Sequence, residues 1–351
     1  MKTETLLNAK KAELKNCTFV KTILMISIVF YHSIVFWRGG WDVVHTTPAA
    51  HSTVLYMLVQ WLAEFQNYAF VFTSGYLFYY VKFERGGYSH FGSFITNKAK
   101  RLLIPFLFVG AVWIIPISCL YLKQDLFQTI KSYLLVWDAG QLWFLFMLFG
   151  VFLIFWPLSN FFAKHHWAGL GVVLAVYALR FALWGFVPSV FSIWNMTRYL
   201  VIFWLGFKFR QGFLDVLRKI PVAVWVIVYT LLLLCFEKIT LPHSTLNKLF
   251  SYGMEFTVHA VGAVMAFMLL QKLANLVHWK DSKVFSFFAG SSMVIYLFHQ
   301  QVIYFTVRSL NGLIDPHIHA VVNFAVAMVI SSAIAWLLMR FRVTRFLIGE
   351  K

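Results

Sequence analysis

The sequence predicts an all-α, polytopic membrane protein with about ten transmembrane helices and with both termini in the cytoplasm. Three observations lead to this prediction. Hydrophobic residues make up 61% of the 351-residue chain and charged residues only 12%, whereas soluble domains average about 45–50% and about 25%. Apolar runs recur along the whole chain, and basic residues gather in alternate connections between them. This composition excludes a soluble globular enzyme and a disordered chain.

The individual spans follow from length, because a bilayer core of about 30 Å needs roughly 20 apolar residues per helix. Suitable runs lie near 19–37, 54–80, 102–122, 141–160, 167–187, 190–207, 221–236, 254–273, 285–307 and 318–339. No small-residue cleavage site follows the first run, so we expect no cleavable signal peptide. Residues 1–351 are expected to form one integral membrane domain, with a cytoplasmic tail over 1–18, a ten-helix bundle over 19–339 and a second tail over 340–351.

The orientation comes from the distribution of basic residues. The chain carries 30 Lys and Arg against 13 Asp and Glu, a net charge of +17. When the N-terminus is placed inside, most of the Lys and Arg residues fall in the two tails and the connections on the cytoplasmic side, as the positive-inside rule requires. The basicity therefore belongs to the cytoplasmic face and its lipids, and a nucleic-acid partner is not needed to explain it.

Common cofactor and metal motifs are absent from the sequence. Cys17, Cys119 and Cys235 have no metal-ligand spacing. Free thiols packed as small apolar residues are favoured, although a disulfide between Cys119 and Cys235 stays open. There is no Walker loop, GxGxxG, HExxH or HxxxxD pattern, which argues against ATP-driven transport, dinucleotide chemistry and soluble-type acyl transfer. We expect no metal and no permanently bound cofactor.

The first predicted span contains a histidine at membrane depth. Lys21 lies at its cytoplasmic mouth, and His32 follows eleven residues later, which places it about 16 Å deeper along a helix. An ionisable group at that depth needs a partner or a function. His32 could take a proton from a hydroxyl as a general base, or a neighbouring helix could satisfy it; both interpretations stay open.

Two further ionisable groups lie in the second and sixth spans. Glu64 could hold His32 in one tautomer and stabilise its cation, or it could form a structural ion pair with Arg198 or Arg180. Arg198 itself could bind a sugar or an acidic headgroup, or could anchor its helix at the outer interface by snorkelling.

The eighth and ninth predicted spans also contain histidines. His299 precedes Gln300 and Gln301, and this group indicates a polar cavity or hydrogen bonds between helices. Glu255 and His259 are four residues apart on one helical face and could simply pair with each other, so we interpret both as structural.

Basic residues end the cytoplasmic segment 82–101. Lys98, Lys100 and Arg101 are typical of topology determinants and anionic-lipid contacts. Alternatively, they form a phosphate site at a helix N-terminus, where unsatisfied N–H groups also favour anions. Trp143, at the outer start of the fourth span, is either an interface anchor or a stacking platform for a sugar.

Together these segments resemble the acyltransferase-3 family, multi-span membrane enzymes that O-acylate bacterial surface glycans. The matching patterns occur in the family's order: Lys21-x10-His32, Ser74-Gly75-Tyr76, Lys98-x-x-Arg101 before Pro105, Leu142-Trp143-Phe144, and Tyr296-x-x-His299. The chain departs from the family in four places. Lys replaces Arg at positions 21 and 98, which keeps the charge but loses the planar fork; Thr18 replaces a common acid, and Glu64 lies where relatives often carry a base.

The resemblance implies a membrane O-acetyltransferase of the bacterial inner membrane. Acetyl-CoA would be the cytoplasmic donor, and a hydroxyl of a surface or lipid-linked glycan would be the acceptor. His32 would be the general base or, in an open variant, would carry the acyl group, and Glu64 would assist it.

The remaining candidate residues divide between the donor and the acceptor. Lys21, Lys98, Lys100 and Arg101 would bind the donor, and Ser33, Trp143, Arg198 and His299 the acceptor. Ser33 or backbone N–H groups would stabilise the oxyanion. A transporter or flippase for a lipid-linked glycan is the alternative from another class, and a structural partner of a glycan-assembly complex is a third. The sequence leaves a homo-oligomer open.

Overall fold

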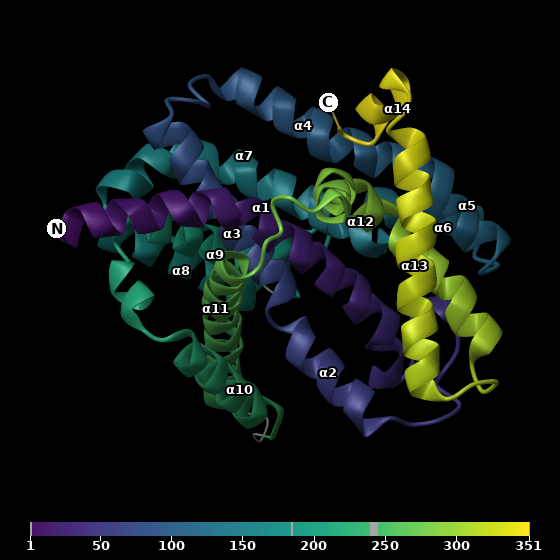
Figure 1. The fold of residues 1–351 in the computed structure, drawn as a ribbon. Helices are drawn as coiled ribbons and strands as arrows, with labels where there is room; N and C mark the ends of the chain where they lie inside the picture. The colour runs from purple at the N-terminus through teal and green to yellow at the C-terminus, as the bar shows by residue number, and fades with distance from the viewer. Residues whose placement is uncertain (1, 184, 239–244, 351) are drawn as a thin grey trace. The chain divides into compact units, whose positions relative to one another are not determined.

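A computed structural model describes residues 2–183, 185–238 and 245–350, and all regular elements in these ranges are helices (Figure 1). A single β-bridge joins Trp41 and Thr46. The α-helices are α1 Lys2–Ile34, α2 Thr53–Ala63, α3 Gln66–Tyr79, α4 Phe91–Val109, α5 Ile115–Leu120, α6 Leu126–Leu134, α7 Trp143–Lys164, α8 His166–Leu183, α9 Ile193–Gln211, α10 Val222–Lys238, α11 Thr245–Leu276, α12 Lys283–Leu310, α13 Pro316–Leu338 and α14 Arg342–Leu347.

Every predicted span falls on one helix or on consecutive helices, so the all-α prediction is confirmed. Among the described residues, six segments are long and apolar enough to cross a bilayer: 10–38, 91–120, 140–164, 166–183, 250–276 and 316–338. The chain is therefore built as a polytopic membrane protein. The count of ten and the cytoplasmic location of both termini stay predictions, and residue 184 of the predicted span 167–187 lies outside the described residues.

Two predicted boundaries are wrong. The second span is not one helix, because the chain breaks between α2 and α3 at Glu64 and Phe65. The third span begins well before residue 102, since α4 starts at Phe91 with His90 as its N-cap. Polar residues at the start of α4 hid this beginning from a hydropathy argument. Position 98 and its neighbours therefore lie inside a helix, where backbone N–H groups already bond to carbonyls.

The described chain forms two compact units. One comprises Met1–Ser27, Gln60–Arg85 and Ile202–Ala289, and the other comprises Ile28–Val59, Gly86–Val201 and Gly290–Lys351. In the first unit, α3 packs on α11, and α11 packs on α10. In the second, α4 packs along α7, and α14 packs on α4.

A close helix crossing organises the first unit. A Cβ atom at Gly75 of α3 would collide with the backbone carbonyl of Phe203 in α9, and a Cβ atom at Gly206 of α9 would collide with that of Phe72. The two helices therefore touch backbone to backbone at reciprocal glycines, a mode of packing that membrane helices favour. This contact explains why a glycine occupies the centre of the Ser74-Gly75-Tyr76 pattern.

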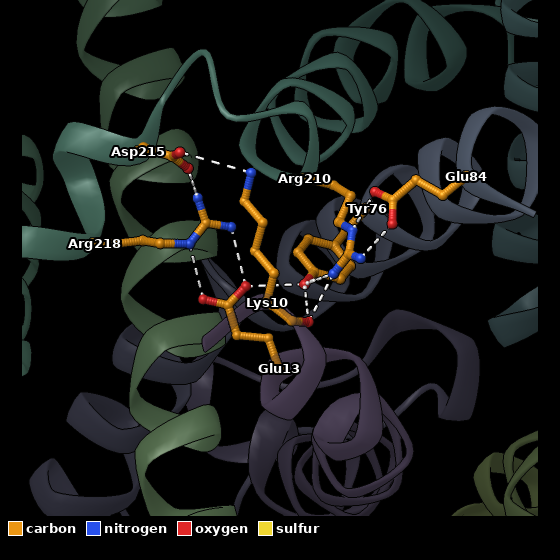
Figure 2. Close-up of polar contacts among 7 residues, drawn as sticks. All are labelled: Lys10, Glu13, Tyr76, Glu84, Arg210, Asp215 and Arg218. Atoms are coloured by element: carbon orange, nitrogen blue, oxygen red, sulfur yellow. Dashed lines mark hydrogen bonds and ion pairs between the residues drawn. The ribbon is translucent and has the colours of Figure 1, made fainter. Parts of the chain in front are cut away.

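Ion pairs and hydrogen bonds link four segments of the same unit (Figure 2). The guanidinium of Arg210 binds both carboxylate oxygens of Glu84, at 2.7 and 2.5 Å, and also donates to the Tyr76 hydroxyl at 2.8 Å. Tyr76 in turn donates to Glu13 at 2.9 Å, and Arg218 binds the two oxygens of Glu13 at 2.9 and 3.0 Å. Burial alone lowers the pKa of Arg210, but its bonds to Glu84 and Tyr76 outweigh this, and the pKa lies above its usual value.

Candidate active site

Two histidines meet at the centre of the second unit. His32, near the C-terminal end of α1, and His299, in α12, place Nδ1 and Nε2 respectively 2.8 Å apart. The His299 ring is completely buried, whereas His32 is partly exposed. The pair therefore has an inner member fully enclosed by protein and an outer member with part of its surface exposed.

Hydrogen bonding fixes the tautomers of both rings when they are neutral. His299 Nδ1 lies 2.8 Å from the Tyr296 carbonyl, which can only accept, so this nitrogen carries the proton. His299 Nε2 is then an acceptor, and His32 Nδ1 must donate to it. The unprotonated nitrogen of His32 is consequently Nε2, which has no hydrogen-bond partner among the described residues. A lone pair on the accessible ring is what a general base requires.

Hydrogen bonds to Gln141 hold the segment of α12 that carries His299. Gln141 Nε2 donates to the Leu297 carbonyl at 2.6 Å, and the Tyr296 hydroxyl donates to the Gln141 carbonyl. The side-chain amides of Gln141 and Gln301 also bond reciprocally, at 3.0 and 3.1 Å. These hydrogen bonds involve Tyr296, Leu297 and Gln301, and together they fix the rotation of α12 and hence the direction of the His299 ring.

Aromatic rings surround the histidine pair. Trp41 stacks parallel to His32, with centroids 6.2 Å apart and planes at 7°, and Tyr304 meets Trp41 edge to face at 4.9 Å. Trp41 was missed by sequence reasoning. The available signal was its position just after the glycine pair that ends the first span, where Gly39 and Gly40 both adopt positive φ.

Trp143, predicted to contact the acceptor, connects to the same site through rings. Its ring lies 5.9 Å from Phe144, Phe144 lies 6.2 Å from Tyr296, and Tyr296 lies 5.8 Å from His299. Trp143 is thus part of the wall around the pair, without a direct contact to either histidine ring. Its role toward a sugar stays a prediction.

Comparison with known protein families gives the chain its classification. A family model described as an acyltransferase domain matches residues 16–340. The chain belongs to the acyltransferase-3 family. The match begins before Lys21 and ends after the last predicted span, so it includes both histidines of the pair. It makes the chain a membrane acyltransferase. No curated protein and no solved structure matches the chain.

The carboxylate expected to assist the base is bound elsewhere. Glu64 Oε2 lies 2.5 Å from His259 Nε2, and the His259 ring stacks on Tyr68 at 3.8 Å. His259 therefore has a partner outside its own helix, and its pairing with Glu255 stays a prediction. The group on His32 Nδ1 is His299, a neutral acceptor instead of a carboxylate. An assisting role of Glu64 toward His32 stays a prediction.

Ser33 does not offer its hydroxyl to a substrate in this structure. The side chain is fully buried, and Oγ donates to the Val29 carbonyl one turn earlier at 2.8 Å. Asn323 of α13 donates to the Ser33 carbonyl at 3.0 Å. The residue that follows the catalytic candidate therefore anchors α1 to α13, and a role of Ser33 toward the acceptor or an oxyanion stays a prediction.

The basic pattern of the family divides into two environments here. Lys98 points its ammonium into a ring cage, 3.9 Å from the Phe152 centroid, 5.2 Å from Tyr88 and 5.5 Å from Phe94. Lys100 and Arg101, in contrast, are exposed on α4. Because α4 begins at Phe91, the predicted phosphate site at a helix N-terminus is wrong for these residues.

Arg101 also borders the C-terminal segment. Burial raises the pKa of the Glu350 carboxyl, and the charges of Arg101 and Arg345 oppose that rise. Gly349 lies directly against the Arg101 backbone, where a Cβ atom would collide with the carbonyl.

The remaining candidates lie on helices without a resolved role. Lys21 lies on α1, three helical turns before His32, and is half-buried. Arg198 lies on α9 and is also half-buried. All three cysteines are free thiols, and within the described ranges no cluster of three or more His, Cys, Asp or Glu residues is arranged to hold a metal ion.

Proposed function

We propose that this acyltransferase moves an acetyl group from cytoplasmic acetyl-CoA to a hydroxyl of a surface or lipid-linked glycan, in the inner membrane of a bacterium. The observation that carries the proposal is the hydrogen-bonded histidine pair, which leaves Nε2 of the accessible ring free to take a proton. Membership of the acyltransferase-3 family supports the acyl-transfer chemistry, and the resemblance described above supports the donor and the acceptor.

His32 acts as general base on the acceptor in this proposal. Its Nε2 takes the proton of the hydroxyl while the oxygen attacks the thioester carbonyl, and the resulting tetrahedral intermediate expels the thiolate of coenzyme A. The imidazolium then returns its proton to sulfur, so the products are an acetyl ester and the free thiol. Throughout, the Nδ1–H of His32 donates to His299, and this bond strengthens when His32 becomes a cation.

His299 takes over the role that a carboxylate has in other relays. A neutral imidazole orients His32 and accepts its hydrogen bond, but it does not neutralise the cation as a carboxylate would. The base is therefore easily deprotonated after each turnover. Transfer through an acetyl-histidine on Nε2 is the variant of the mechanism that uses the same nitrogen as a nucleophile.

Donor binding is assigned to cations exposed toward the cytoplasm. Coenzyme A carries several phosphate charges, and Lys100 and Arg101 are accessible on α4. Lys98 contributes less directly, because its ammonium is enclosed by rings. Lys21 stays a candidate on the first helix. A flippase for a lipid-linked glycan would use a polar membrane cavity too, but it needs neither a thioester donor nor a proton-accepting nitrogen.

The test measures transfer of radiolabelled acetyl groups from acetyl-CoA to glycan in membranes that contain the protein. His32→Ala should reduce transfer by roughly 10²- to 10⁴-fold while the protein still inserts and folds. His51→Ala, which removes an exposed histidine of the connection after α1, is the matched control and should be unaffected. A wild-type rate of acetyl transfer by His32→Ala would refute the proposed mechanism. Loss of whole glycan from the surface, with no loss of acetyl groups per sugar, would favour the flippase.

A further inference from the structure

The second unit contains a polar cavity whose lining includes Tyr304, two ring contacts away from His32. Its volume is about 310 Å³, within the range of roughly 300–1,000 Å³ that small-molecule pockets span. One wall consists of Gln128, Thr129 and Ser132 of α6, and the opposite wall includes Gln301 and Tyr304 of α12. Hydroxyl, amide and carboxylate groups on opposite sides of a small cavity are suited to a polyhydroxylated ligand, because such a ligand both donates and accepts hydrogen bonds.

The wall helix α6 is anchored firmly despite its short length. Asp125 caps its N-terminus and accepts the Gln128 N–H at 2.8 Å. Near its other end, the buried Tyr133 donates to the Phe106 carbonyl at 2.5 Å. The Tyr133 ring occupies space that only a glycine leaves open, since a Cβ atom at Gly110 would collide with it. The cavity is therefore bounded by a fixed element.

The two faces of α6 are chemically different. Gln128, Thr129 and Ser132 line the cavity, whereas Leu126, Phe127, Ile130 and Leu134 are exposed. An amphipathic helix with one apolar face exposed is typical of a segment lying in the membrane interface. The cavity therefore opens at headgroup level, where a sugar attached to a lipid or to a membrane-proximal polymer is presented.

The cavity connects to the proton-accepting histidine through two rings. The Tyr304 hydroxyl, which lines the cavity, accepts a hydrogen bond from Gln300 at 2.6 Å and keeps its own proton for donation. The Tyr304 ring meets Trp41 edge to face, and Trp41 stacks on His32. A sugar in the cavity thus lies against the same aromatic wall that borders the base.

The charge of the lining selects among sugars. Asp125 and Asp138 are the only ionisable side chains in the cavity wall apart from Tyr304, and the wall includes no lysine or arginine. The nearest basic residue of α6, Lys131, is exposed and lies 5.9 Å from the Trp137 ring instead. A neutral or amino sugar fits this negative lining, whereas the carboxylate of a uronic acid would be repelled.

The turn that carries Asp138 contains residues with unusual backbone conformations. Val136, which ends the turn after α6, adopts φ of 58°, a left-handed conformation that is unusual for a β-branched residue. Gly140 also has positive φ, and a Cβ atom there would press on the Gln301 amide. The backbone is thus held in a costly conformation at the rim of the cavity, as is common at ligand sites.

We propose that this cavity, between α6 and α12, binds an uncharged or amino-bearing sugar unit of the acceptor glycan and discriminates against uronic acids. The inference rests on the proposed acetyl transfer, because it supplies the acceptor for His32. Asp138 and the hydroxyl and amide groups of α6 recognise the sugar, and Tyr304 orients it toward the base.

Binding can be measured without chemistry by leaving out acetyl-CoA. The full-length protein in lipid nanodiscs would be titrated with methyl glycosides of glucose, N-acetylglucosamine, glucosamine and glucuronic acid, and followed by saturation-transfer NMR. The neutral and amino glycosides should bind roughly tenfold more tightly than the glucuronide. Asp138→Asn should raise glucuronide affinity by about fivefold or more. Asp281→Asn, which removes an exposed carboxylate outside the cavity lining, is the matched control and should change nothing.

The outcomes separate this inference from the proposed function. Glucuronide binding as tight as glucoside binding, equal effects of Asp138→Asn and Asp281→Asn, or no binding of any neutral glycoside would overturn the inference. Loss of all sugar binding in Gln128→Leu, with an unchanged melting temperature, would support it. Selective sugar binding without acetyl transfer would refute the proposed function but not the sugar site. Acetyl transfer without sugar binding in the cavity would refute the sugar site but not the proposed function.

Discussion

Removing His299 tests the histidine pair by a predictable amount. His299→Leu deletes the acceptor of the His32 Nδ1–H bond, which spans 2.8 Å. Between neutral groups such a bond contributes about 0.5–1.5 kcal/mol, and once His32 is a cation it contributes about 1.5–3 kcal/mol. The difference of about 1–1.5 kcal/mol applies only to the transition state, so kcat should fall roughly tenfold. Loss of tautomer control adds to this reduction.

The graded series of variants makes the prediction specific. His299→Gln keeps an acceptor oxygen and should be more active than His299→Leu, whereas His32→Ala should be the least active. The assay is steady-state transfer from acetyl-CoA in nanodiscs, with kcat and KM determined separately. KM for acetyl-CoA should stay constant, since His299 is completely buried and no donor contact is assigned to it. A folded His299→Leu protein with wild-type kcat would refute the relay.

Three further predictions concern packing and charge. Gly75→Ala should lower the melting temperature, because overpacking costs about 1–3 kcal/mol, whereas Gly171→Ala, with open space around it, should be neutral or stabilising. Arg210→Lys loses the two-pronged bond to a carboxylate and should also lower the melting temperature. Lys100→Gln should raise KM for acetyl-CoA in the transfer assay, whereas Lys98→Met should change the melting temperature and leave that KM nearly constant.

Each of these three predictions can be contradicted by a specific result. Equal melting temperatures for the two glycine variants would argue against the close helix crossing. Arg85 is exposed and adjacent to Glu84, so an equal loss of stability in Arg85→Lys would mean that Arg210 acts only through general charge. A large rise of KM for acetyl-CoA in Lys98→Met would return that lysine to the donor site.

Sequence reasoning located helices well because the relevant signal is local. An apolar run of sufficient length must become a helix in a bilayer, where every backbone group needs an internal partner. The same reasoning did not predict α6, because a nine-residue amphipathic helix contains no long apolar run. It also placed the start of α4 too late, because the polar first turns of that helix resemble a loop.

Partners across helices could not be predicted in the same way. Glu255 and His259 have the correct spacing to pair within one helix, but His259 Nε2 binds Glu64, at the break between α2 and α3. The choice depends on the rotation of α11 against α3, which residue spacing does not encode. The pairing of His32 with His299 has the same origin. The sequence marked both as unusual at membrane depth, but only the folded chain brings the two rings together.

The reciprocal amide bonds between Gln141 and Gln301 have a consequence for an enzyme in an energised membrane. A transmembrane voltage exerts work of about 2.3 kcal/mol per unit charge for each 100 mV across the bilayer. The amide pair carries no net charge, and each amide both donates and accepts. The voltage therefore has no net charge on this clamp to act upon, and proton gradients cannot titrate it. The clamp thus adds neither a gating charge nor a titrating group of its own to the α12 segment.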